Sequence, residues 1–254
     1  MRVLLSGWLL AACLLAAAPA VATERHATVP LKSLAELDAW QPDKAPWNGA
    51  SERLRRRAGA DHPLAGLWLP VAPGQSRRMR VLAMHDMGAG YLADQDRYPG
   101  GTDNDRLYRF THWQYVDAFV YFSHSRVSFP PPGWTDSAHR NGVLSLGTFD
   151  IEGEGTEAEI RKLLDDPTRR ARYAGKLAEI AARYGFDGYL VNVEVALPGD
   201  AAAARKRAQS LRAFVAELRA AVRKRIPRGE VIWYDSITRS GTLDYQNELN
   251  DENR

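Results

Sequence analysis

The chain has 254 residues, of which 26% are charged and 45% hydrophobic, and its formal net charge is only +3. This composition indicates an ordinary globular protein, with room for one large α/β domain or two small ones. Basic residues gather at Arg53–Arg57 and Arg219–Arg228. The second cluster follows a helical pattern, so we interpret it as a solvated helix face and expect no nucleic-acid partner.

The first 22 residues have the pattern of a secretory signal peptide. An arginine is followed by an apolar run and then by small residues around Pro19. A transmembrane anchor is the alternative, but the run is short for a membrane span. The only cysteine, Cys13, stands in a lipobox-like context, so a lipid on Cys13 is a further alternative that would attach the protein to a membrane. The apolar residues after Cys13 favour ordinary cleavage instead. The sequence therefore predicts export, whether secreted, periplasmic or at the cell surface.

Residues 23–78 offer little periodicity beyond a short helical pattern at Leu31–Trp40, and we expect an N-terminal extension packed on a domain. Residues 79–254 instead alternate short apolar runs with helical stretches. A capping-box spacing at Thr156 and Glu159 predicts a helix start, and Gly185 predicts a helix end. The predicted strands are Val81–Met87, Ala118–His124, Val143–Asp150, Gly188–Val195 and Val231–Ser236.

Strands alternating with helices predict parallel strands joined by crossovers, in a doubly wound sheet or a TIM barrel. Polar side chains end each predicted strand, which favours the (β/α)8 TIM barrel, where several strand ends share one site. Only five strands are found where such a barrel has eight. The sequence therefore predicts a partial barrel, truncated after about the fifth strand.

Asn192 and Glu194 are the strongest candidates for chemistry. Residues two apart in a strand point the same way, so both would point into the barrel while Val191, Val193 and Val195 face the helices. A buried carboxyl group is costly unless it is paired or hydrogen-bonded. The alternative is a structural Glu194 paired with an Arg or Lys inside the barrel.

One carboxyl group beside an amide narrows the possible reactions. Ordinary retaining glycosidases need a second carboxylate as the nucleophile. In a substrate-assisted reaction the 2-acetamido group of N-acetylglucosamine is the nucleophile instead. Such an enzyme needs an acid/base, here Glu194, and a group that holds the acetamide, here Asn192.

Several ordered motifs resemble family 85 of the glycoside hydrolases, the endo-β-N-acetylglucosaminidases. The resemblance runs from about residue 81 to residue 250. Its motifs are His85–Tyr91, Phe119–His124, Leu146–Phe149, Tyr184–Glu194 and Trp233–Ser236.

This resemblance implies a TIM barrel that hydrolyses the bond between the two core N-acetylglucosamines of N-glycans, with retention through an oxazoline and some transglycosylation. By position, Asn192 matches the family's acetamide-orienting asparagine, Glu194 its acid/base and Tyr234 a tyrosine that helps hold the acetamide. No metal or organic cofactor is implied, and the expected partners are N-linked glycans of glycoproteins. The chain departs from the family at Ser125, where a second histidine is common, and at Val195, where asparagine is frequent.

Further residues are predicted to contact the sugar because aromatic faces and forked polar groups suit carbohydrates. For two of them, Trp113 and Phe122, ordinary barrel packing is an equal alternative. The segment Phe129–Trp134 is interpreted as a stiff loop above the strands, and whether it borders the cleft is left open. The predicted substrate-binding residues are His85, Asp86, Trp113, Phe122 and His124.

Two alternatives to this function stay open from the sequence. A chitinase-like hydrolase of N-acetylglucosamine polymers would want a D-x-x-D-x-D-x-E strand, and Asn192 stands where that pattern has aspartate. A partial barrel that binds glycans without turnover is the other alternative, and the missing strands support it.

Overall fold

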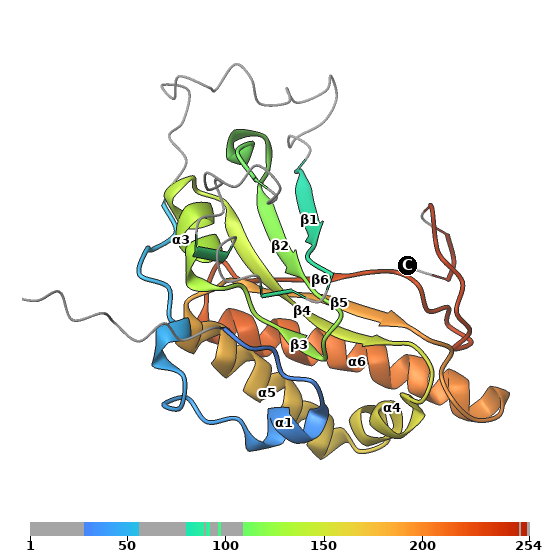
Figure 1. Ribbon diagram of the computed structural model, residues 1–254. Helices are drawn as coiled ribbons and strands as arrows, with labels where there is room; N and C mark the ends of the chain where they lie inside the picture. Colours follow the sequence, from blue (N-terminus) through green and yellow to red (C-terminus); the bar gives the residue numbers. More distant parts are fainter. Residues whose placement is uncertain are drawn as a thin grey trace, which may run out of the picture.

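Five parallel strands form the centre of the structure, in the spatial order β1-β2-β4-β5-β6 (Figure 1). This computed structural model describes residues 28–55, 80–88, 90–91, 96–97, 109–248 and 250–252. The predicted signal segment, Cys13 included, and residues 56–79 of the predicted extension lie outside the described residues. The strands are β1 (Leu82–Asp86), β2 (Ala118–Phe122), β3 (Val127–Ser128), β4 (Leu144–Glu152), β5 (Gly188–Glu194) and β6 (Glu230–Trp233).

All five predicted strands are confirmed, and the short β3 is an addition that pairs antiparallel with β4. The helical elements are α1 (Leu34–Ala39), η1 (Pro46–Asn48), η3 (Trp113–Tyr115), α3 (Pro132–Arg140), α4 (Glu157–Leu164), α5 (Pro167–Tyr184) and α6 (Ala201–Arg225).

The two faces of the sheet are covered differently, and this distinguishes a barrel from a doubly wound sheet. On the outer face, strand residues such as Phe149 and Val191 pack against α5 and α6, and Phe119 packs against Trp134 of α3. Figure 1 shows α4, α5 and α6 side by side on that face. The inner cluster contains, among the described residues, only strand side chains and Leu54. Strands in sequence order with helices on one face are the arrangement of a (β/α)8 TIM barrel over part of its circumference.

Local sequence explains the two long helices. In α5, Pro167 occupies the first turn, the Asp166 side chain accepts hydrogen bonds from two backbone N–H groups, and Gly185 ends the helix with φ of 81°. In α6, the Asp200 side chain caps the first turn. The apolar side chains of both helices recur at helical spacing and lie in the outer core.

Two local predictions are wrong. The capping box at Thr156 and Glu159 does not form, because Glu159 accepts hydrogen bonds from Leu34 N–H (2.9 Å) and Arg126 Nε (2.6 Å). The predicted loop around Trp134 is the start of helix α3, and the Trp134 ring is fully buried against Phe119 and does not border a cleft.

Residues 28–55 wrap around the barrel strands and helices. Leu31 forms a β-bridge with Val127, α1 packs on α5, and Leu54 reaches the inner core. Asp38 ties α1 to the helices through Tyr173 Oη (2.9 Å) and Lys162 Nζ (3.3 Å). This segment is therefore packed into the same body as the sheet.

A buried ion pair holds the end of this segment. His139 of α3 donates from Nε2 to Asp187 (2.8 Å) and from Nδ1 to the carbonyl oxygen of Glu52 (2.7 Å). Because both partners are acceptors, both ring nitrogens carry hydrogen and the imidazole is charged. Burial lowers the pKa of His139, but the hydrogen bond and charge of Asp187, together with the Glu52 carbonyl, outweigh it and raise the pKa above its usual value.

We predict that His139→Ala lowers the free energy of unfolding by about 3 kcal/mol near pH 6, because it leaves the Asp187 carboxylate buried without its cation. Because the pKa of His139 is higher in the native state than in the unfolded state, its contribution to stability is fully present below the unfolded pKa of about 6.5. This contribution is lost as the pH rises through the native-state pKa. The difference between variant and unaltered protein should therefore shrink toward about pH 9. Urea unfolding at both pH values measures it, with the exposed His112→Ala as the control. A difference that grows with pH would contradict the charged pair.

Candidate active site

The register of β4 against β5 brings four polar side chains together at the carboxyl ends of the strands. Asp150 is paired with Asn192, and Glu152 with Glu194. All four are on the inner face, because the residues between them, such as Val191 and Val193, lie in the outer core. Below them the inner face is apolar, with Leu190 and Phe122 in the inner cluster. The sheet thus presents a polar end on an apolar floor.

The amide of Asn192 is held between two carboxyl groups. Its Nδ2 donates to Asp150 Oδ1 (2.8 Å) and to Glu194 Oε2 (2.9 Å). The side chain is almost fully buried, at 2% exposure. Because both neighbours present acceptor oxygens, the amide nitrogen must face them, and its two N–H groups are then used. The polar atom of Asn192 that is left to meet another molecule is Oδ1.

Asp150 is an unusual carboxyl group because it is 3% exposed. Burial raises its pKa to about 7; the hydrogen bond from Asn192 opposes this rise, and the nearby charge of Glu152 adds to it. Arg126 lies close by, but its guanidinium donates to the Asp150 carbonyl oxygen and to Glu159. The positive charge therefore does not form a direct bond with the Asp150 carboxyl group.

His124 connects the remaining carboxylates. Its Nδ1 is hydrogen-bonded to Glu152 Oε1, and its Nε2 lies 3.3 Å from Asp86 Oδ2. The hydrogen bond with Glu152 is the main cause of a raised pKa of His124, with a further contribution from Asp86. The ring of His124 stands edge-on to Phe122, with 5.1 Å between centroids. This chain of contacts joins the ends of β1, β2 and β4.

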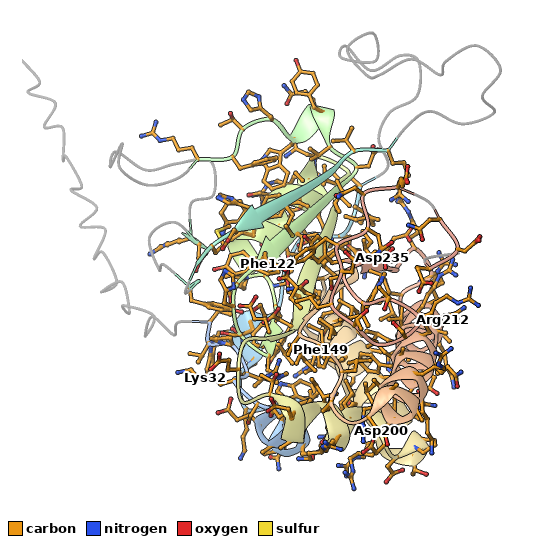
Figure 2. All side chains as sticks on the ribbon, turned by 90° about the vertical axis from the view of Figure 1, so that its right-hand side faces the viewer. Lys32, Phe122, Phe149, Asp200, Arg212 and Asp235 are labelled. Carbon is orange, nitrogen blue, oxygen red and sulfur yellow. The ribbon has the colours of Figure 1, made fainter. Side chains whose placement is uncertain are left out.

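A polar cavity of about 680 Å³ opens above these residues. It draws on distant segments, because Lys32 comes from the N-terminal segment and Tyr245 from the chain after β6. Figure 2 shows Lys32 and Phe122 on the same side of the molecule, away from Arg212 and Asp235. The cavity is lined by Lys32, His124, Ser125, Arg126, Asp150, Glu152, Gly153, Glu194 and Tyr245.

Tyr245 gives the cavity an aromatic side. Its ring is half exposed and lies 6.2 Å from the ring of Tyr234. Tyr245 and Glu194 line the same cavity, and the negative charge of Glu194 raises the pKa of the Tyr245 hydroxyl. Tyr234, 38% exposed, stands behind Tyr245 and does not line the cavity itself.

The structure brings together most of the residues that the sequence singles out. Asn192 and Glu194 are adjacent, Asp86 and His124 are in contact, and Phe122 lies beneath them. Among the described residues, no group of three or more His, Cys, Asp or Glu side chains is arranged to hold a metal ion.

Two predicted sugar contacts lie elsewhere. His85 is on the outer face of β1, where its ring is 6.3 Å from Phe119 and 5.9 Å from Trp134. Trp113 is 7% exposed in the same outer cluster, 5.2 Å from Phe119. Both side chains are outer-core residues in this structure, on the wrong side of the sheet for the cavity.

Sequence reasoning also missed residues. Asp150 and Glu152 line the cavity beside Glu194, so the premise of a single carboxyl group is wrong. The register of β4 against β5 would have revealed them, since polar residues two apart end both strands. Lys32 and Tyr245 carry no comparable signal, because each comes from outside the barrel strands.

We predict that Asp150→Asn gains stability over the unaltered protein as the pH rises. The pKa of Asp150 is about 7 in the native state, above its value in the unfolded state, so the native state binds more protons between about pH 4 and pH 7. The free energy of unfolding of the unaltered protein therefore falls as the pH rises through this range, by up to about 1.4 kcal/mol per pH unit. Asparagine keeps an acceptor for Asn192 and removes the titration. Thermal or urea unfolding from about pH 5 to about pH 8 measures the gain, with the exposed Asp43→Asn as the control. A difference that is constant with pH would contradict the raised pKa.

Comparison with known proteins gives a consistent picture. The sequence model of glycosyl hydrolase family 85 matches residues 91–254. The cytosolic endo-beta-N-acetylglucosaminidase of Gallus gallus is 45% identical over 214 residues, covering 82% of this chain and 28% of that protein. The Mus musculus protein of the same name is 40% identical over 234 residues, covering 91% and 29%. Cytosolic endo-beta-N-acetylglucosaminidase 1 of Arabidopsis thaliana is 37% identical over 228 residues, covering 89% and 30%.

Among solved structures, the chain resembles the Spr0440 glycoside hydrolase domain, Endo-D, from Streptococcus pneumoniae R6. The TM-score is 0.67 at 25% identity, over 89% of this chain and 34% of that one. The chain spans 28–30% of the length of the three relatives above.

These relatives correct one prediction. The sequence predicts export, with a signal peptide at residues 1–22, whereas all three are named cytosolic proteins. The prediction of an exported or secreted protein is therefore wrong. Within the described ranges, no helix has the length and apolar character to span a membrane. With a family model that matches most of its length and relatives at 37–45% identity, the chain belongs to glycosyl hydrolase family 85.

Proposed function

We propose that the protein is an endo-β-N-acetylglucosaminidase that hydrolyses the GlcNAc-β1,4-GlcNAc bond of the N-glycan core. The names of the relatives support this substrate class, although the chain spans less than a third of their length. The observation that carries the proposal is the amide of Asn192, fixed between Asp150 and Glu194 beneath a polar cavity.

The proposed reaction uses the substrate's own acetamide as the nucleophile. The acetamide carbonyl oxygen forms a bond to the anomeric carbon as the bond from that carbon to the leaving sugar's oxygen breaks. Glu194 donates its proton to that oxygen. Positive charge develops on the acetamide, and its N–H becomes a stronger hydrogen-bond donor. Asn192 Oδ1 accepts this hydrogen bond. The product of this step is an oxazolinium ion, the protonated oxazoline, whose N–H remains hydrogen-bonded to Asn192 Oδ1.

The second step reverses these roles. Water attacks the anomeric carbon of the oxazolinium ion, and Glu194 takes a proton from that water. The bond from the anomeric carbon to the acetamide oxygen breaks, which restores the neutral acetamide with its N–H. Two inversions at the same carbon give net retention. A sugar hydroxyl in place of water would give transglycosylation.

Other residues around the cavity suit the binding of a sugar. The ring of Tyr245 offers apolar contact at the cavity wall, and Phe122 packs against the His124 ring. His124, with Asp86 beside it, offers polar groups to sugar hydroxyls. Tyr234, next to Tyr245, is proposed to help hold the acetamide. The partners that follow are N-linked glycans of glycoproteins.

Mass spectrometry of glycans released from a high-mannose glycoprotein tests this function. We expect a released glycan that keeps one reducing-end N-acetylglucosamine, and no comparable cleavage of chitin oligomers. Glu194→Gln removes the proton donor and should lower the rate by at least about 100-fold. The exposed Glu157→Gln is the matched control and should leave the rate unchanged. Released glycans that carry both core sugars, or full activity of Glu194→Gln, would rule the proposal out.

A further inference from the structure

The strongest unexplained feature is the buried carboxyl group of Asp150. It is 3% exposed, and the side-chain hydrogen bond found for its carboxyl oxygens within the described chain is the one from Asn192 Nδ2, at 2.8 Å. Its backbone is already secured, since its N–H donates to the Arg126 carbonyl and its carbonyl accepts from the Arg126 guanidinium. The strand therefore does not need the carboxyl group for its own pairing.

Keeping a carboxyl group at this position lowers the stability of the fold. Removing an ionisable group from water is unfavourable unless several partners compensate for it. An asparagine would offer Asn192 an uncharged acceptor at the same place, and a leucine would have a similar branched shape without polar atoms. The cost points to a function of Asp150 beyond packing.

Asp150 acts through Asn192, because its hydrogen bond helps to set the orientation of the Asn192 amide. Without an acceptor at position 150, the Asn192 amide keeps only the contact with Glu194 Oε2 (2.9 Å) and can rotate about its last bond. Rotation would exchange Nδ2 and Oδ1 and present N–H groups where an acceptor is needed. With both carboxyl groups in place, the amide plane is fixed at two points. A charged acceptor also makes the stronger hydrogen bond and polarises the amide, so that Oδ1 becomes a better acceptor.

No other described side chain supplies this second contact. Glu152 lines the same cavity, but its Oε1 is bonded to His124 Nδ1. Glu159 is bonded to Arg126 and to the Leu34 N–H. Thr148, the next inward-facing residue of β4 below Asp150, donates to the Tyr121 carbonyl (3.1 Å).

We propose that Asp150 is the positioning residue that fixes the Asn192 amide with Oδ1 toward the reacting acetamide, so that it acts on oxazoline formation and not on oxazoline breakdown. This rests on the proposed function. In the first step Oδ1 must accept from the acetamide N–H as the carbonyl oxygen attacks. In the second step the ring is already closed, and Glu194 with water does the remaining proton transfer.

Two substrates separate these steps: an intact N-glycan, which requires both, and a supplied glycan oxazoline, which requires only the second. The full-length protein is assayed on both, unaltered and as three variants. Asp150→Leu keeps the branched shape of the side chain, with methyl groups in place of the two oxygens, and removes the acceptor, whereas Asp150→Asn keeps the acceptor. Thr148→Val perturbs the same strand without touching Asn192.

We expect Asp150→Leu to lower kcat on the intact glycan about 100-fold, the usual order for a misplaced catalytic group, and kcat on the oxazoline by less than about 10-fold. Asp150→Asn should restore the glycan rate to within about 5-fold, because the hydrogen bond is kept. Thr148→Val should leave the ratio of the two rates unchanged. If Asp150→Leu does not fold by circular dichroism, Asp150→Ala removes the same acceptor and replaces it in the comparison.

The proposal is overturned if Asp150→Leu lowers both rates in parallel, or if Asp150→Asn is no more active on the glycan than Asp150→Leu. Failure of the proposed function looks different. In that case the unaltered protein itself would neither release glycan nor consume the oxazoline.

Discussion

The Asn192 amide, hydrogen-bonded to Asp150 on one side and to Glu194 on the other, is the contact on which the site depends. It fixes which atom of the amide faces the substrate, and it holds the carboxyl group of Glu194 close to the amide. The contact exists only because β4 and β5 are parallel neighbours with Asp150 opposite Asn192. A slip of one residue by either strand would turn the two polar side chains of that strand into the outer core.

The surrounding structure supports that register and forms the walls of the cavity. Apolar side chains below the polar end, among them Leu190 and Phe122, give the site a dry floor. The N-terminal segment is tied to helix α5 by the Asp38 side chain and to helix α3 by the Glu52 carbonyl, which is hydrogen-bonded to His139. It brings Lys32 to the cavity wall, so residues far from the barrel strands in sequence help to shape the site.

Much of this could be predicted from the sequence, and the reasons are physical. Alternation within β5 placed Asn192 and Glu194 on one face, because a strand has a period of two. The same rule shows why His85 and Asp86 could not both face the sugar: they are adjacent in β1, and only Asp86 is near His124. Asp150 was recognisable as a strand-end residue, but its contact with Asn192 depends on the pairing of two strands, which no local pattern encodes.

The places of Tyr245 and Lys32 at the cavity could not be predicted from the sequence for a related reason. They lie in irregular or bridging segments, where no periodicity fixes the direction of a side chain. The Glu159 side chain was misread because it serves a segment 125 residues away. Contacts between distant segments, and not local propensity, account for what the sequence left out.

The most direct test of this account is a crystal structure of the Glu194→Gln variant with an intact N-glycan in the cavity. The account predicts that the acetamide nitrogen of the sugar next to the cleaved bond lies about 2.7–3.2 Å from Asn192 Oδ1, with Asn192 still bonded to Asp150. The acetamide oxygen should lie about 3 Å from the anomeric carbon. An acetamide turned away from Asn192, or one held by Asp150 in its place, would contradict it.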